Sequence, residues 1–234
     1  MIEILNILFQ VFFLFVLNFF PKQFFFTKNS YTKNVHIFSN IFILITLLFL
    51  SFIDLRIKFV LIILYFIFFL NLFFIFKNKS LNIFIFNNNW LVFIVVIVLS
   101  ISLSVNLKLG WDVQNFWIQK YLNFKNELGL NNLGNLARSE YPYLGTYIWA
   151  IFSETSFFKF EYLGRIYFIY IFCISLKRLV DFTDYDESDK SLLFIIILFL
   201  IYNLNLISGY QEILVFSYLI FLSTYMYYLL LNKF

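Results

Sequence analysis

The residues best suited to chemistry lie in one stretch, between Lys108 and Leu163, where polar residues interrupt an otherwise apolar chain. Asp112 leads them, because it follows Gly110-Trp111 directly after an apolar run. A carboxylate there can act as general base toward an acceptor hydroxyl or amine, or ligate a divalent cation such as Mg²⁺ or Mn²⁺, which prefers oxygen ligands. It can equally cap the helix expected after it, since Asp is favoured at helix N-termini. The spacing leaves these readings open.

Two basic and two further acidic residues complete the candidate set. Lys120 and Arg138 suit a phosphate group, to which arginine offers a bidentate fork; the alternative is contact with solvent or lipid headgroups. Glu140 and Glu212 are candidates for a second acidic or acceptor-binding site. Their alternative roles are a structural turn for Glu140 and a first-turn helix carboxylate for Glu212.

Other kinds of site find no support in the sequence. One cysteine, Cys173, and one histidine provide no Cys/His metal set, and neither a G-x-S-x-G elbow nor a P-loop is present. These absences argue against hydrolases of those types and against ATP-driven machinery. The formal charge of +4 is scattered between apolar runs without a basic cluster, so no nucleic-acid partner is expected.

The elements that must position the candidate residues are apolar helices. Of the 234 residues, 62% are hydrophobic and 13% charged, with a mean hydropathy of +0.87, whereas a soluble domain carries about 25% charged residues. An apolar run of about 18 residues or more crosses a bilayer as a helix. The sequence therefore predicts an all-α, polytopic transmembrane protein with about seven spans: Ile4–Phe20, Val35–Ile53, Phe59–Phe76, Trp90–Val105, Leu163–Val180, Ser191–Leu206 and Ile213–Leu231.

A single transmembrane domain is expected over 1–234, with four spans in 1–107, a long outer loop in 108–162 and three spans in 163–234. Within the loop, apolar residues at helical spacing predict an amphipathic helix lying on the membrane surface: Val113, Phe116, Trp117, Tyr121 and Phe124. A second segment, Tyr143–Phe152, is too short to span and is expected to be interfacial or re-entrant.

The distribution of basic residues predicts the orientation. If Tyr143–Phe152 does not span, the loops richest in lysine and arginine share one side with the C-terminus, and the short 53–58 turn shares the other side with the long loop. Short cytoplasmic loops carry the Lys/Arg excess. The long loop and the 208–212 turn are therefore expected on the extracytoplasmic face.

Three motifs carry a resemblance to a known family: Gly110–Lys120, Glu140-Tyr141-Pro142 and Glu161–Arg165. Together they resemble the GT-C superfamily of polytopic membrane glycosyltransferases, and most closely its bacterial members similar to dolichyl-phosphate-mannose-protein mannosyltransferases. In that family the first large outer loop carries an essential acidic residue, which Asp112 matches. Ser208–Glu212 resembles a second family segment, which more often reads Tyr-x-Asp.

The resemblance implies a function as well as a fold. The expected partners are the lipid bilayer, a sugar donor linked to polyprenyl phosphate, and a glycan, lipid or protein acceptor, at the outer face of a bacterial inner (plasma) membrane. Asp112 is expected to deprotonate the acceptor, and Lys120 or Arg138 to meet the donor phosphate. Two departures stand out: Arg138 occupies a neighbourhood where the family often has histidine, and family members are usually much longer, which implies a fragment or a split subunit.

Competing classes remain open beside this reading. A transporter or flippase component would show internal repeats and helices broken at mid-membrane, which the sequence lacks. A polysaccharide polymerase or ligase tends to depend on Arg and His in its outer loop, whereas here the leading residue is an Asp. An inactive accessory membrane subunit fits the short chain.

Overall fold

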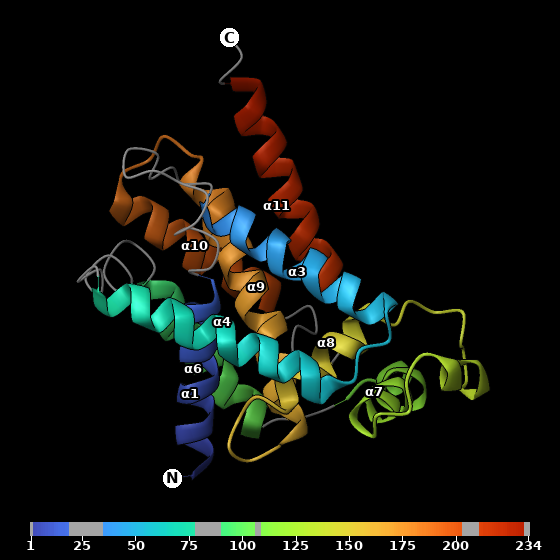
Figure 1. Cartoon of the computed structure of the whole chain (residues 1–234). Coiled ribbons are helices and arrows are strands. Elements are labelled where there is room, and N and C mark those ends of the chain that lie inside the picture. Colours follow the sequence, from blue (N-terminus) through green and yellow to red (C-terminus); the bar gives the residue numbers. More distant parts are fainter. Residues whose placement is uncertain (1, 19–34, 78–89, 106–108, 203–210, 232–234) are drawn as a thin grey trace.

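The computed structural model is all α-helical across the residues that it describes, 2–18, 35–77, 90–105, 109–202 and 211–231. The 208–210 part of the second family segment lies outside these ranges. The helices in them are α1 (Ile2–Leu17), α3 (Val35–Phe52), α4 (Ile57–Lys77), α6 (Trp90–Val105), the π-helix η1 (Val113–Trp117), α7 (Ile118–Lys125), the 3-10 helix η2 (Asn131–Asn135), α8 (Leu144–Ser153), α9 (Glu161–Asp181), α10 (Glu187–Tyr202) and α11 (Glu212–Leu231) (Figure 1).

Each of the seven apolar runs coincides with a helix, but within the described ranges only α4 is long and apolar enough to cross a membrane. It has 21 residues and a mean hydropathy of 2.9 over its best window. α1 and α6 have 16 residues each, about 24 Å of helix against a hydrocarbon core of about 30 Å. α9 has the length, but Arg165, Lys177 and Arg178 interrupt its apolar sequence. The structure thus shows the all-α class and one candidate membrane helix.

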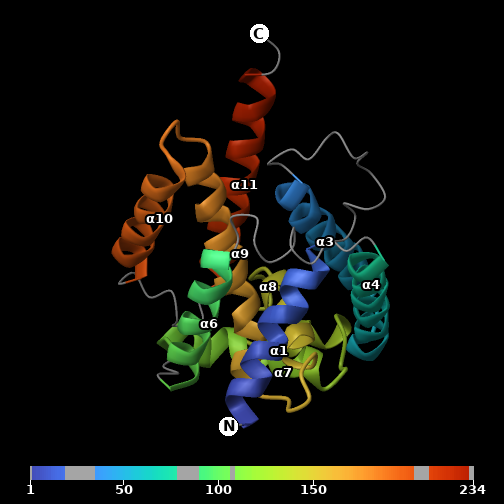
Figure 2. The same ribbon diagram turned by 90° about the vertical axis from the view of Figure 1, so that its left-hand side faces the viewer.

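α9 forms the centre of the molecule, with α1, α6, α8, α10 and α11 packed around it (Figures 1 and 2). From Leu163 to Val180 every residue except Leu179 is buried. Gly164 lets α8 approach closely, because a Cβ atom at this position would lie 2.1 Å from the carbonyl oxygen of Trp149. Close packing around one central helix therefore holds the ends of the other helices in fixed positions.

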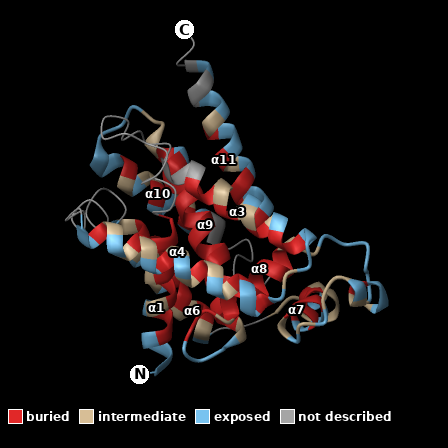
Figure 3. Ribbon diagram, in the orientation of Figure 1, coloured by how far each residue is buried: buried red, intermediate tan, exposed pale blue. Residues whose placement is uncertain are grey.

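α4 has one face toward the protein and one away from it. Its buried residues recur every three or four positions, as expected for a helix that packs along one side: Ile57, Val60, Leu64, Phe68, Asn71 and Ile75. The opposite side is equally apolar but exposed, and Figure 3 shows buried and exposed positions alternating along α4. A helix that is apolar on both faces is found either in the core of a large protein or across a membrane, and one face of α4 is exposed.

The described part of the long loop folds into an ordered helical unit that packs on the rest of the protein. The predicted amphipathic helix forms as η1 followed by α7, and Val113, Trp117, Tyr121 and Phe124 are buried. Their partner is α8: the rings of Tyr121 and Trp149 lie 4.9 Å apart. The apolar face that was expected to meet the membrane surface is thus covered by α8, and the position of the unit relative to a membrane stays a prediction.

α8 is the predicted short segment, and it is an interior helix. It has ten residues, and all from Gly145 to Ser153 are buried (Figure 3). It packs against α3, α4, α7 and α9. Its length, about 15 Å, agrees with the prediction that it does not span. Neighbouring helices cover its faces, and its expected interfacial or re-entrant depth in a membrane stays a prediction.

The turn between α3 and α4 lies against the long loop, as expected for two segments on the same side of the protein. The Leu130 amide donates to Oδ1 of Asp54 at 2.9 Å, and Nζ of Lys58 lies 3.2 Å from Oε2 of Glu127. The hydroxyl of Tyr147 on α8 donates to the carbonyl of Leu55 at 3.1 Å. These contacts fix the loop unit to the end of the α3–α4 pair.

Candidate functional site

Lys120 is the centre of the loop unit. Its side chain is fully buried at 0% exposure, and its ammonium donates to the carbonyls of Arg138 at 2.6 Å and Tyr141 at 2.7 Å. The same ammonium lies 5.6 Å from the ring centroid of Trp117 and 5.8 Å from that of Tyr141. One cation on α7 thereby fastens the 138–141 turn onto the η1–α7 helix.

Burial changes the chemistry of Lys120. Loss of solvent lowers the pKa of its ammonium below the ordinary lysine value, and the carboxylate of Glu140 offsets part of this effect. Both of its hydrogen-bond partners are main-chain oxygens. In this conformation the ammonium of Lys120 is enclosed by protein and holds the turn, whereas its expected contact with a phosphate stays a prediction.

Arg138 is the cation that faces outward. It is exposed and has a φ of 55°, in the left-handed region that costs energy for a residue with a Cβ. Its guanidinium lies 5.9 Å from the ring centroid of Phe116 and 5.8 Å from that of Tyr141, and Nη1 is 3.5 Å from Oε1 of Glu140. Both side chains of this ion pair are more than half exposed. Such a pair contributes little to stability, so the guanidinium is available to an anionic ligand.

Asp112 begins η1 on the same unit. It stands at the N-cap position, but its side chain makes no capping hydrogen bond, so the structure does not support the capping role. Within the described ranges its partly buried carboxylate has no ion pair or hydrogen bond. The neighbouring Trp111 packs edge-on against Phe116, with centroids 5.6 Å apart, and Phe116 in turn lies 6.1 Å from Tyr141. The rings of Trp111, Phe116 and Tyr141 therefore form a chain of contacts from the residue next to Asp112 to the 138–141 turn. π-Helical turns such as η1 occur frequently at functional sites.

Glu212 lies apart from this group. It is exposed in the first turn of α11. The preceding Gln211 packs on α8, where a Cβ atom at Gly145 would lie 1.9 Å from the Gln211 Oε1 atom. The first turn of α11 is therefore beside the first turn of α8, directly after the 138–141 turn. The structure brings Lys120, Arg138 and Glu140 into contact and leaves Glu212 on a neighbouring element.

The described part of the chain does not assemble a metal site. It contains no group of three or more His, Cys, Asp or Glu side chains placed to hold an ion. Asp112 would be a lone protein ligand there, so the residues present do not fit Mg²⁺ or Mn²⁺, and no step below uses a metal.

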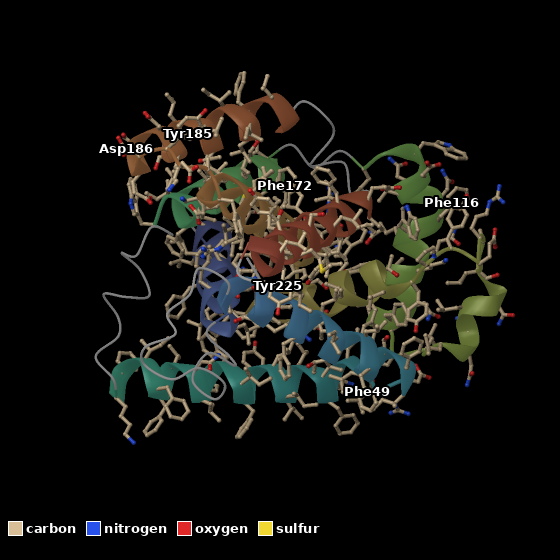
Figure 4. All side chains as sticks on the ribbon, turned by 90° about the horizontal axis from the view of Figure 1, so that it is seen from above. Phe49, Phe116, Phe172, Tyr185, Asp186 and Tyr225 are labelled. Carbon is tan, nitrogen blue, oxygen red and sulfur yellow. The ribbon has the colours of Figure 1, made fainter. Side chains whose placement is uncertain are left out.

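Sequence reasoning missed the aromatic residues that build the site. Phe116, Trp117 and Tyr141 form the surface on which both cations rest (Figure 4 shows Phe116 at the edge of the molecule). Cation–π contact of this kind is a specific attraction. The available signal was the aromatic-rich composition of the loop, in which Phe116 and Trp117 had been assigned to the membrane-facing side of an amphipathic helix.

A second polar group also escaped prediction. Arg165 on α9 is 3% exposed, its guanidinium lies 5.6 Å from the ring centroid of Trp149, and its Nη1 has no partner within the described ranges. Glu161 precedes it by one helical turn, and its main-chain carbonyl accepts the indole N–H of Trp149 at 3.0 Å. The i, i+4 spacing of two charges at the start of an apolar run was the signal available.

Compared with known proteins, the chain matches no family model, and no curated protein or solved structure matches it significantly.

Proposed function

We propose that this chain is a multi-pass membrane protein whose loop unit is the active site of a glycosyltransferase using a polyprenyl-phosphate-linked sugar. The membrane part is supported by the exposed side chains of α4. Soluble monomers rarely expose large contiguous apolar patches, yet α4 exposes a full-length apolar stripe, each member more than half exposed: Phe59, Ile62, Phe66, Phe69, Phe73 and Phe76. α10 and α11 expose similar rows, among them Phe199 and Leu219.

One observation carries the enzymatic part. The long loop is an ordered unit that holds the carboxylate of Asp112, which has no partner among the described residues, and the outward-facing guanidinium of Arg138 on a turn held by Lys120. A general base and a phosphate-binding cation are the two groups that sugar transfer from a lipid phosphate needs. The resemblance to the GT-C superfamily assigns the acidic position to Asp112, whereas Arg138 stands where the family often has histidine.

The reaction follows as a single displacement. The acceptor hydroxyl oxygen attacks the anomeric carbon, and Asp112 takes its proton. The bond between that carbon and the phosphate oxygen breaks, its electron pair leaves on the polyprenyl phosphate, and the configuration inverts. Arg138 exchanges its weak partner Glu140 for the phosphate oxygens as charge develops on them. Lys120 holds the turn that carries Arg138 and Glu140.

The test is transfer of a radiolabelled sugar from its polyprenyl phosphate in membranes containing the chain. Asp112→Asn is expected to lower the rate by about a hundredfold to ten-thousandfold, the usual contribution of a general base. Asp186→Asn is the matched control, since Asp186 is an exposed carboxylate at the far edge of the molecule (Figure 4). Equal rates for wild type and Asp112→Asn would refute the mechanism. Absence of transfer by the wild-type chain would overturn the enzymatic assignment in favour of an accessory subunit.

A further inference from the structure

A polar cavity of about 190 Å³ lies between the α3–α4 turn and the chain that follows α7 (Figure 1). It has room for about six water molecules, and therefore for a single monosaccharide ring. The buried side chains of Phe124 and Tyr147 line it from the protein interior. Its lining also includes the charged residues Asp54, Arg56 and Glu127. The cavity thus combines aromatic side chains with charged groups of both signs.

The charged groups around this cavity keep hydrogen-bonding capacity for a ligand. Oδ1 of Asp54 accepts the amide of Leu130 at 2.9 Å, whereas Oδ2 has no hydrogen bond or ion pair within the described ranges. Lys58 pairs with Oε2 of Glu127 at 3.2 Å, and Oε1 has no ion pair there. The exposed guanidinium of Arg56 has no partner among the described residues. Fixed carboxylate acceptors and a free guanidinium donor therefore meet at one cavity.

The backbone around the cavity adopts a costly conformation. Apart from Arg138, the described residues with a positive φ are Asp54 at 53°, Glu127 at 58° and Gly129 at 74°, and all three line the cavity. Glu127 follows the end of α7, where a left-handed residue is usually glycine. Non-glycine residues in this region cost free energy and cluster at ligand-binding and active sites. Both carboxylates of the cavity are carried by such residues, which favours a binding role.

We propose that this cavity binds one neutral hexose ring. The two carboxylates repel an anion, and the guanidinium of Arg56 opposes a bare cation. The hydroxyls of a sugar satisfy both kinds of group, because they donate to carboxylates and accept from a guanidinium. The C–H face of a hexose is apolar, as are the rings of Phe124 and Tyr147.

The position of the cavity makes this hexose a unit of the acceptor glycan, an assignment that rests on the proposed function. Phe124 lies four positions after Lys120 on the same helix, which is about 6 Å along its axis. The cavity is thereby about one helical turn from the residue that holds the 138–141 turn. A glycan bound here by one sugar can extend its next sugar toward Arg138 and Asp112.

The experiment uses the full chain in lipid nanodiscs, with the methyl α-hexopyranosides of mannose, glucose and galactose as probes. At least one should receive saturation transfer in NMR and slow hydrogen exchange over residues 127–133. Asp54→Asn keeps the oxygen that holds the Leu130 amide and tolerates the left-handed backbone, but turns the free acceptor into a donor. It should weaken hexoside binding about tenfold to a hundredfold, the factor for a hydrogen bond to a charged group. Asp186→Asn, at the far edge of the molecule, should bind as the wild type does (Figure 4).

Two matched tryptophan variants locate the site. Leu128→Trp should fill the cavity and abolish binding, whereas Leu122→Trp, outside its lining, should leave binding unchanged; the two positions are 55% and 45% exposed. Absence of binding by all three hexosides, or equal binding by Asp54→Asn, would overturn the inference. Slower exchange with Ca²⁺ alone, and with no hexoside, would overturn it in favour of a cation site. Hexoside binding without sugar transfer by the wild-type chain would instead refute the proposed function and leave the hexose site in place.

Discussion

Replacing Lys120 by methionine tests whether one buried cation holds the candidate active site together. Methionine keeps the length of the side chain and is a good helix former, so α7 itself is retained. The change removes the donors to the carbonyls of Arg138 and Tyr141. Hydrogen bonds to charged groups contribute about 1.5–3 kcal/mol each. Because the turn is exposed, its carbonyls regain water when the donor is lost, and a net local cost of about 2–4 kcal/mol follows.

The Tyr141 amide reports on this turn, because it donates to the carbonyl of Arg138 at 3.1 Å. A local cost of 2–4 kcal/mol corresponds to opening that is about 30-fold to 700-fold more frequent. Hydrogen exchange read by mass spectrometry over residues 136–143 measures it directly. Peptides from α9 should exchange as in the wild type, since their helix packs elsewhere.

Lys125→Met is the matched control for this prediction. Lys125 lies on the same helix, 3.8 Å from Glu154, and its side chain is 29% exposed. A partly exposed pair contributes at most about 1 kcal/mol, so the exchange rate of the 136–143 turn should change less than about fivefold. Wild-type exchange in Lys120→Met, or the same acceleration in both variants, would refute the central role of Lys120.

Two further predictions concern α8 and its neighbours. Gly164→Ala should destabilise the fold by about 3 kcal/mol, the upper range for overpacking, because the added Cβ meets main-chain atoms of Trp149; thermal unfolding in detergent measures it. Tyr147→Phe should flatten the alkaline loss of stability. The pKa of the Tyr147 hydroxyl is raised, chiefly by burial and to a smaller extent by the negative charge of Asp54. The fold therefore retains the proton more tightly than the unfolded chain, and this contribution is complete below a pH of about 10 and declines as pH rises further. Denaturation at pH 8 and pH 11 tests it.

Controls for both come from the same chain. Gly134→Ala adds a Cβ that meets nothing within 4 Å, and it should leave the unfolding temperature unchanged. Tyr185→Phe removes an exposed tyrosine and should keep the wild-type pH dependence. If Gly134→Ala and Gly164→Ala unfold alike, close packing between α8 and α9 is not what fixes this interface. A Tyr147→Phe protein with an unchanged alkaline slope would show that Tyr147 is not the titrating group.

The positions of the helices could be predicted from the sequence because apolar runs and helical spacing are local properties. The runs at Phe59–Phe76 and Trp90–Val105 correspond to α4 and α6 within a few residues. In the loop, the spacing of Val113, Trp117 and Tyr121 predicted both the helix and its buried face. The candidates Lys120, Arg138 and Glu140 also proved to be neighbours, although they are spread over 21 positions of the sequence.

What packs against each face could not be predicted, because it depends on contacts between residues far apart in the chain. Lys120 was expected to meet a phosphate group, or else solvent or lipid headgroups. Its burial follows from the return of the 138–141 turn across α7, where two carbonyls replace the water that the ammonium loses. Hydrogen-bond partners of this kind arise from backbone geometry, including the positive φ of Arg138, and no side-chain pattern records them.

Composition and periodicity predict a helical, strongly apolar protein with one polar loop rich in ionisable groups. They can do so because both are properties of short stretches of sequence. Only the packing of the helices places α8 in the interior, encloses Lys120 in protein and leaves Arg138 exposed. Burial and hydrogen bonding are properties of pairs of segments, and only the packing of α8 and α9 with their neighbours determines which pairs meet.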